Sequence, residues 1–187
     1  NGYEEGGGIW MNGSSPSITN VVIDENIANR GAGIACLESS SPTLINVTIS
    51  NNTAEEYGGG IYSDESGLFI ENSLLENNSS HYEGSALYSN ERYNDNTFIM
   101  TTTTISNNIS LYPDSYPGAA LLITETLDAE ITNSIIWGNT PFDAYDSVST
   151  VEVNYSNVNG RSDQYSESNY WIEGIGNIDT DPLRSEE

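Results

Sequence analysis

The chain has 187 residues, which suffices for one elongated domain, and only 36% of them are hydrophobic. Its 28 acidic residues stand against four arginines and no lysine, so the formal net charge is −24. Binding to a phosphate backbone needs cationic side chains that release counterions, so this charge argues against nucleic acid and anionic membrane surfaces as partners. No apolar run approaches the ~20 residues of a membrane span, so membrane insertion is not expected.

Four glycine-rich corners recur along the first half of the chain. They are Gly6–Trp10 (GGGIW), Gly31–Ala35 (GAGIA), Gly58–Tyr62 (GGGIY) and Gly84–Tyr88 (GSALY). Their first glycines are 25, 27 and 26 residues apart. A period in this range is typical of a solenoid, in which each repeat forms one coil stacked on the previous one.

Short predicted strands lie between the corners, at residues 18–23, 44–49, 69–75, 98–105 and 131–136. These runs are rich in β-branched residues, alternate polar with apolar positions, and lack a helical period. A repeat of about 26 residues with three short strands and three turns would close a triangular coil. Stacked coils would then pair each strand in parallel with its copy, at a spacing of roughly 4.8 Å.

Two columns of asparagine come into register with the glycines. The first contains Asn20, Asn46 and Asn72 and continues through Thr102 to Asn133; the second contains Asn26, Asn52, Asn78, Asn108 and Asn139. Asparagine tolerates left-handed backbone conformations, and its amide can bond the asparagines above and below it. We therefore expect both columns to be structural, with corners and an internal ladder.

These motifs resemble a known family. The Gly-Gly-Gly-Ile-Tyr corner with a downstream Asn-Asn is similar, over about residues 3–140, to right-handed parallel β-helix proteins of bacterial surfaces and secretions, including the chlamydial polymorphic outer-membrane protein repeats. The tail, 151–160 and 176–183, looks like the closing segment of many secreted bacterial β-helix proteins. The resemblance implies an all-β, right-handed parallel β-helix of about six coils in an extracellular or cell-surface protein. It implies no single activity, since adhesins, lyases, hydrolases and epimerases share the fold.

Departures from the period indicate the domain organisation. We expect coils over 1–158, with irregular insertions around 90–117 and 138–150, and a polar loop with a closing segment of the same domain over 159–187. No cap precedes the first coil, so we expect either a longer chain or end-to-end association of copies.

No catalytic residue is predicted. β-Helix lyases need a basic residue beside a uronate, and hydrolases of this fold use clustered aspartates, whereas this chain lacks lysine and the Asn-Thr-Asp, Asp-Asp and Gly-His-Gly motifs. Arg92 and the lone His81 are expected to be solvated loop residues. A lyase- or epimerase-type fragment is the alternative, which predicts arginine and carboxylates converging near Arg92.

Aromatic residues follow the glycine corners. If the preceding Ile or Leu points inward, alternation turns Trp10, Tyr62 and Tyr88 outward on one face, with Tyr62 stacked over Tyr88. Exposed aromatic faces on a rigid wall suit a sugar ring or a partner protein. These three residues are therefore the predicted ligand-binding site for a glycan or a protein, and bracing of neighbouring coils is the structural alternative.

Acidic residues precede the same corners. In a regular coil Glu56 and Glu83 would fall near one another, and stacked like charges repel. Calcium takes oxygen ligands of this kind, so Ca²⁺ bound by Glu56 and Glu83 is the predicted cofactor, with solvent and salt as the alternative. No Asp-x-Asp-x-Asp-Gly loop is present.

Together these observations predict a non-enzymatic extracellular module that acts as an adhesive or structural scaffold. Its lateral face would contact glycans or proteins. A polysaccharide lyase or epimerase fragment is one alternative, and a fibre subunit that assembles by end-to-end coil stacking is another.

Overall fold

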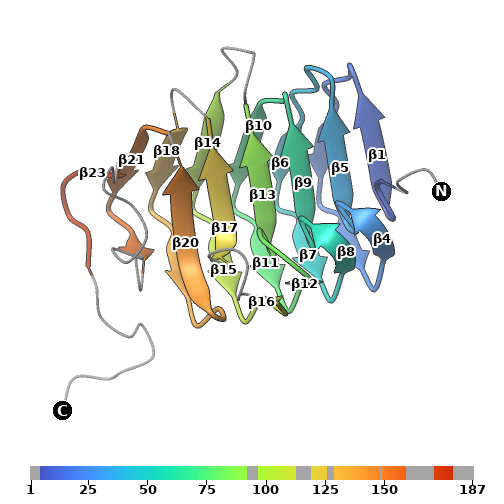
Figure 1. Cartoon of the computed structure of the whole chain (residues 1–187). Coiled ribbons are helices and arrows are strands. Elements are labelled where there is room, and N and C mark those ends of the chain that lie inside the picture. The colour runs from blue at the N-terminus through green and yellow to red at the C-terminus, as the bar shows by residue number, and fades with distance from the viewer. Residues whose placement is uncertain are drawn as a thin grey trace.

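The computed structural model describes residues 5–91, 97–112, 119–125, 129–147, 149–158 and 171–178. Every regular element in these ranges is a β-strand, and the strands pair in parallel with their copies in the neighbouring coils (Figure 1). The chain therefore winds into a β-solenoid, which confirms the expected all-β fold.

The described strands form four parallel sheets. Sheet 1 contains β1 (Ile9–Asn12), β5 (Ile34–Leu37), β9 (Ile61–Asp64), β13 (Leu87–Asn90), β17 (Ala119–Thr124) and β20 (Phe142–Ser147). Sheet 2 contains β2 (Ser17–Thr19), β6 (Thr43–Ile45), β10 (Leu68–Glu71), β14 (Phe98–Thr101), β18 (Ala129–Thr132), β21 (Val151–Asn154) and β23 (Trp171–Glu173). Sheet 3 contains β3 (Val22–Asp24), β7 (Thr48–Ser50), β11 (Leu74–Glu76), β15 (Thr104–Ser106), β19 (Ile135–Trp137) and β22 (Asn157–Val158). Sheet 4 contains β4 (Ile27–Arg30), β8 (Thr53–Tyr57), β12 (Ser79–Ser80) and β16 (Ile109–Ser110).

The coil differs from the expected one in number and in outline. The chain makes about five turns instead of the predicted six, and its first four coils contain four strands instead of three. The additional strand forms where a turn was predicted, because the residues between the second asparagine column and the glycine corner stay extended and pair as sheet 4.

The predicted irregular segments are only partly described. Residues 142–147, within the expected second insertion, form β20 and extend sheet 1 beside β17. In the other predicted insertion, residues 92–96, which include Arg92, and residues 113–117 lie outside the described residues, whereas the part between them contains β14, β15 and β16. In the tail, β23 pairs with β21, and Ile178 forms a bridge with Asn157, so these tail residues continue the same solenoid.

The corners adopt the backbone conformations that the repeat predicts. The first asparagine column has left-handed φ angles between 49° and 59° at Asn20, Asn46, Asn72, Thr102 and Asn133. Glycine meets two different demands at its corner: Gly58 has a φ of +65°, while a Cβ on Gly59 would lie 2.4 Å from the carbonyl oxygens of Ser79 and Ser85. The left-handed turn and the close approach of neighbouring coils therefore both need glycine.

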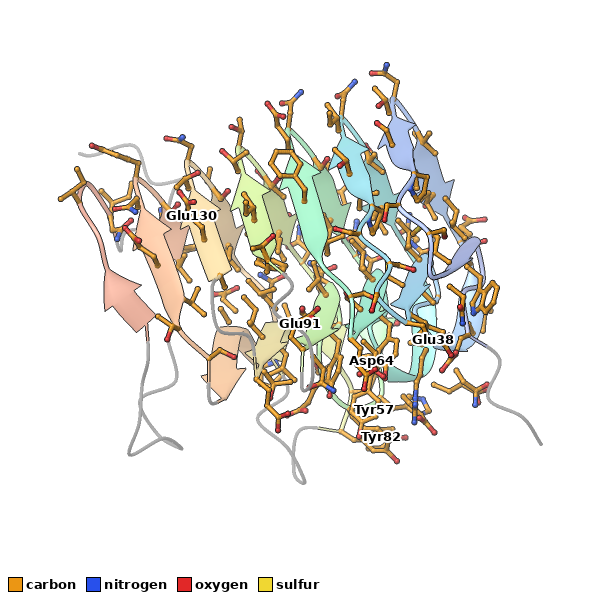
Figure 2. All side chains as sticks on the ribbon, turned by 90° about the horizontal axis from the view of Figure 1, so that it is seen from above. Glu38, Tyr57, Asp64, Tyr82, Glu91 and Glu130 are labelled. Carbon is orange, nitrogen blue, oxygen red and sulfur yellow. The ribbon has the colours of Figure 1, made fainter. Side chains whose placement is uncertain are left out.

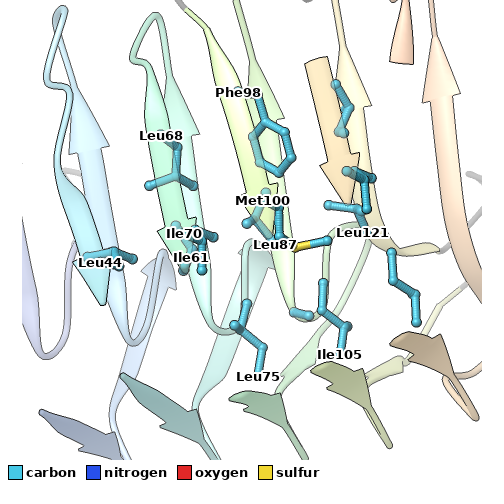
Figure 3. Close-up of a cluster of buried hydrophobic side chains, with 14 of the residues drawn as sticks. Leu44, Ile61, Leu68, Ile70, Leu75, Leu87, Phe98, Met100, Ile105 and Leu121 are labelled. Carbon is cyan, nitrogen blue, oxygen red and sulfur yellow. The ribbon is translucent and has the colours of Figure 1, made fainter. Parts of the chain in front are cut away.

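A continuous file of apolar side chains fills the interior of the solenoid. Figure 3 labels ten of them, each at most 2% exposed: Leu44, Ile61, Leu68, Ile70, Leu75, Leu87, Phe98, Met100, Ile105 and Leu121. Cys36 belongs to the same cluster, and its burial raises the pKa of the thiol to about 12. Each coil thus buries its apolar face against the next, which a single coil could not do alone.

The second asparagine column forms the expected ladder inside the coils. Each Oδ1 accepts the backbone N–H and the side-chain Nδ2–H of the asparagine one coil earlier, at 2.9–3.0 Å, through Asn26, Asn52, Asn78, Asn108 and Asn139. The ladder ends at Asp143, whose Oδ1 accepts both donors of Asn139 at 2.7 and 2.6 Å. Aspartate lacks the side-chain amide N–H that each asparagine donates, so the run of amide-to-amide bonds ends at Asp143.

Candidate functional site

Four tyrosines gather where sheet 4 meets sheet 1. Tyr57 is the last residue of β8, Tyr62 lies in β9, Tyr82 follows β12, and Tyr88 lies in β13. The Tyr57 ring centroid is 5.5 Å from that of Tyr82 and 5.1 Å from that of Tyr88. The Tyr62 and Tyr88 rings stack at 5.2 Å with an angle of 18° between their planes. We call these four residues the tyrosine cluster; Figure 2 shows Tyr57 and Tyr82 at one edge of the solenoid.

Strand register and a bulge bring the cluster together. Tyr62 and Tyr88 are direct partners in β9 and β13, so both rings project from the outer face of sheet 1. The pairing of β4 with β8 shifts between Ala28 and Arg30, so that Arg30 lies opposite Tyr57. This shift absorbs the extra residue of the 27-residue repeat and aligns Tyr57 with the position just before the glycine corner.

The structure confirms that Tyr62 stacks on Tyr88, but it shows these two rings to be less exposed than predicted. Tyr62 is only 6% exposed, and Arg30 lies over its ring; Tyr88 is half-buried, and Tyr57 lies against it. Burial, as the main cause, raises the pKa of the Tyr62 phenol to about 12. Trp10 is 55% exposed, but the buried Ala35 separates it from Tyr62 in the register of sheet 1. Trp10 thus lies outside the tyrosine cluster.

Arg30 holds one end of the cluster. Its Nη2 and Nε atoms each lie 2.7 Å from Oε2 of Glu56. Its guanidinium carbon is 5.7 Å from the ring centroids of both Tyr57 and Tyr62, a distance typical of cation–π contacts. The arginine therefore neutralises Glu56 and braces two tyrosines from successive coils.

The predicted calcium pair does not form the stack on which that prediction rested. At the glycine corners, the Gly31 N–H donates to the Tyr57 carbonyl and the Gly58 N–H donates to that of Glu83. Glu83 therefore follows Tyr57 in its column, whereas Glu56 turns to Arg30, which relieves its charge. Across the described ranges no three His, Cys, Asp or Glu side chains are grouped for a metal ion. Calcium at Glu56 and Glu83 stays a prediction.

Glu83 is a buried acidic residue whose pKa is raised. It is 8% exposed, and burial raises its pKa from 4.5 to about 7. Its carboxyl group has no hydrogen bond or ion pair with any described residue. Glu83 follows Tyr57 in its column and comes directly after Tyr82 in the chain, so it borders the tyrosine cluster. Burial, followed by the charges of Tyr62 and Glu83, raises the pKa of the Tyr88 phenol.

Sequence reasoning missed a column of glutamates at the corner that follows sheet 1. Glu38, Glu65, Glu91 and Glu125 take the same place in successive coils. Figure 2 shows Glu38 and Glu91 along this edge, with Asp64 between them. Each lies four residues after the first inward Ile or Leu of its strand, so alignment on the glycine corners could have found this glutamate column. Glu91 alone turns inward: it is 3% exposed and accepts the Ser66 N–H at 2.9 Å.

Of the two other residues considered for catalysis, the structure describes only His81. Arg92 lies outside the described residues. His81 is half-buried and packs edge-on against Tyr112, with ring centroids 5.2 Å apart, rather than standing alone in solvent. Within the described ranges, the arginine and carboxylate that meet are Arg30 and Glu56, which neutralise one another.

Comparisons with known proteins bear on the family and not on the activity. A family model described as a right-handed β-helix region matches residues 2–154, which include every strand from β1 to β21. A search of the curated proteins and a search of the solved structures found no match. Within the part of the chain that the structure describes, no helix has the length and apolar character needed to cross a membrane.

Proposed function

We propose, from the premise that the chain belongs to the right-handed β-helix family, that it is a rigid extracellular binding module and not an enzyme. It would serve as an adhesive or structural scaffold of a bacterial surface or secretion. The tyrosine cluster would contact a glycan or a protein. The observation that carries the proposal is this cluster, which three successive coils build and Arg30 braces.

Partial exposure makes the cluster suitable for binding. Tyr57, Tyr82 and Tyr88 are half-buried, so each presents part of its ring while its base is fixed by neighbouring rings. Tyrosine supplies a large contact area and a polar tip at a low cost in conformational entropy. The parallel ladders below the rings add rigidity, which reduces the ordering cost of association.

The partners of the charged groups support binding over catalysis. Arg30 is engaged by Glu56 and two rings, which leaves it poorly placed to polarise a substrate carboxylate. Asp143 and Glu91 accept main-chain N–H groups and so serve the coil itself.

Replacement of one half-buried ring of the cluster tests the proposal. Full-length protein would be screened against a glycan array and a panel of extracellular proteins. We expect Tyr82→Ala to weaken binding of any ligand found by about tenfold, because rigid aromatic anchors dominate such contacts. Tyr155→Ala is the matched control, since Tyr155 is 56% exposed and lies beyond β21, away from the cluster.

Thermal melts of both variants separate loss of binding from loss of folding. Equal weakening by the two replacements, or no ligand at all, would contradict the proposed function.

A further inference from the structure

Glu83 places a carboxyl group where the described part of the chain gives its charged form no counter-ion. The residue before each glycine corner is Arg30 in one coil, Tyr57 in the next and Glu83 in the one after that. Glu83 is more than nine-tenths buried and has no described polar partner for its carboxyl group. Burial of an unpaired carboxylate is costly, and the rise of its pKa to about 7 expresses this cost.

The opposite end of the same cluster shows what such a site accommodates. There, a guanidinium group rests against Tyr57 and Tyr62 and pairs with a carboxylate at 2.7 Å. At the Glu83 end the carboxylate and the tyrosine rings are present, but no cationic side chain of the described chain accompanies them. Tyrosine faces attract cations, and a nearby carboxylate adds to this attraction.

We propose that Glu83, together with Tyr82 and Tyr88, binds a lysine or arginine side chain of a basic partner protein. This inference rests on the proposed function and names the chemistry of its ligand. A net charge of −24 attracts cationic partners over a long range and repels acidic polysaccharides. Glu38 of the glutamate column is exposed just after the β5 strand of sheet 1, and it offers a further contact to a chain with several positive charges.

The geometry favours a protein side chain over a sugar. Tyr57 is tilted by 43° and 47° to its two neighbours, so the rings form a corner and not the flat platform that suits a sugar face. Lysine and arginine carry their charge at the end of a slender stem, which suits a carboxyl group that is only 8% exposed. An amino group fixed on a bulky sugar ring reaches such a position less well.

Titration of full-length protein with labelled octaarginine and octalysine, at 0.15 M NaCl, tests the proposal. We expect Glu83→Gln to weaken binding by about tenfold, which is the loss of one charge-assisted contact. Glu130→Gln is the matched control, because it makes the same charge change at an exposed position on β18 in sheet 2 (Figure 2). It should weaken binding by less than about twofold.

A second pair of variants tests the ring contact without changing any charge. Tyr82→Phe keeps the aromatic face and should retain binding within about twofold, whereas Tyr82→Leu should weaken it by about threefold or more. Thermal melts show whether each variant is folded.

The outcomes separate this inference from the proposed function. Equal weakening by Glu83→Gln and Glu130→Gln would overturn the inference, since the peptides would then sense only the overall charge. If glucosamine oligomers bind as tightly as the peptides, and this binding also depends on Glu83, the assignment of the ligand to a protein is overturned. If a neutral glycan binds, and its binding depends on Tyr82 but not on Glu83, the inference is overturned and the proposed function is retained. If neither peptides nor any other ligand bind, both fail.

Discussion

Glu83 illustrates how one side chain can set the pH response of a repeat protein. The two residues before it in the column are Arg30 and then Tyr57, so its direct described neighbour there is a neutral ring. Burial holds its pKa at about 7 in the folded chain, against 4.5 for an ordinary glutamate. Between these two values the folded state retains a proton that the unfolded state has released, so stability falls as the pH rises.

We expect Glu83→Gln to raise the free energy of unfolding at pH 8 by about 2 kcal/mol, because the variant avoids a buried charge. At pH 4 the carboxyl group is largely protonated in both states, and the two proteins should be nearly equal in stability. Urea unfolding from pH 4 to pH 8 measures the difference. A constant difference over this range would contradict the raised pKa.

At the scale of elements, the asparagine ladder links the coils through side chains as well as strands. Asn78 is fully buried and connects Asn52 to Asn108 through both its amide groups. Its Nδ2 also donates to the carbonyl of Ile49, so nearly all of its hydrogen-bonding capacity is used.

Removal of one rung should therefore be costly. We expect Asn78→Ala to lower the free energy of unfolding by about 3 kcal/mol, because it leaves the buried Asn52 donors and the Ile49 carbonyl without this partner. Asn12→Ala, at an exposed position on β1, should change stability by less than about 0.5 kcal/mol. Denaturant unfolding of both variants makes the comparison, and similar losses would show that the ladder adds little.

The whole molecule carries its negative charge on a narrow, elongated body. Parallel pairing sets the residues of the glutamate column roughly 4.8 Å apart along the backbone, and like charges at this range destabilise the folded state. Salt shortens the screening length from about 30 Å at 0.01 M to about 3 Å at 1 M. The solenoid should consequently be more stable in concentrated salt.

We expect the Tm of the wild type to rise steadily between 0.01 M and 1 M NaCl. The Tm of Glu65→Gln should rise by less over the same range. Thermal unfolding across the series measures both. A flat or falling Tm would contradict dominant self-repulsion. Calcium chloride at matched ionic strength tests the predicted calcium site, which requires a further rise that Glu56→Gln abolishes.

The candidate site was only partly predictable from sequence. Alignment on the glycine corners correctly stacked Tyr62 on Tyr88, because partners in parallel strands share a register. It could not predict that Tyr62 is buried, since Arg30 reaches it from another strand. It also paired Glu56 with Glu83, because one extra residue before Gly58 moves Tyr57 into the column instead.

The amino-acid sequence by itself determined the parallel solenoid, its left-handed corners and its asparagine ladder. These features depend on local backbone preferences, and every repeat of the chain carries residues with the same preferences. Only the tertiary structure decided which side chains meet around the glycine corner. There a one-residue bulge, and not the average period, sets the register, so that Arg30, Tyr57 and Glu83 follow one another across three coils.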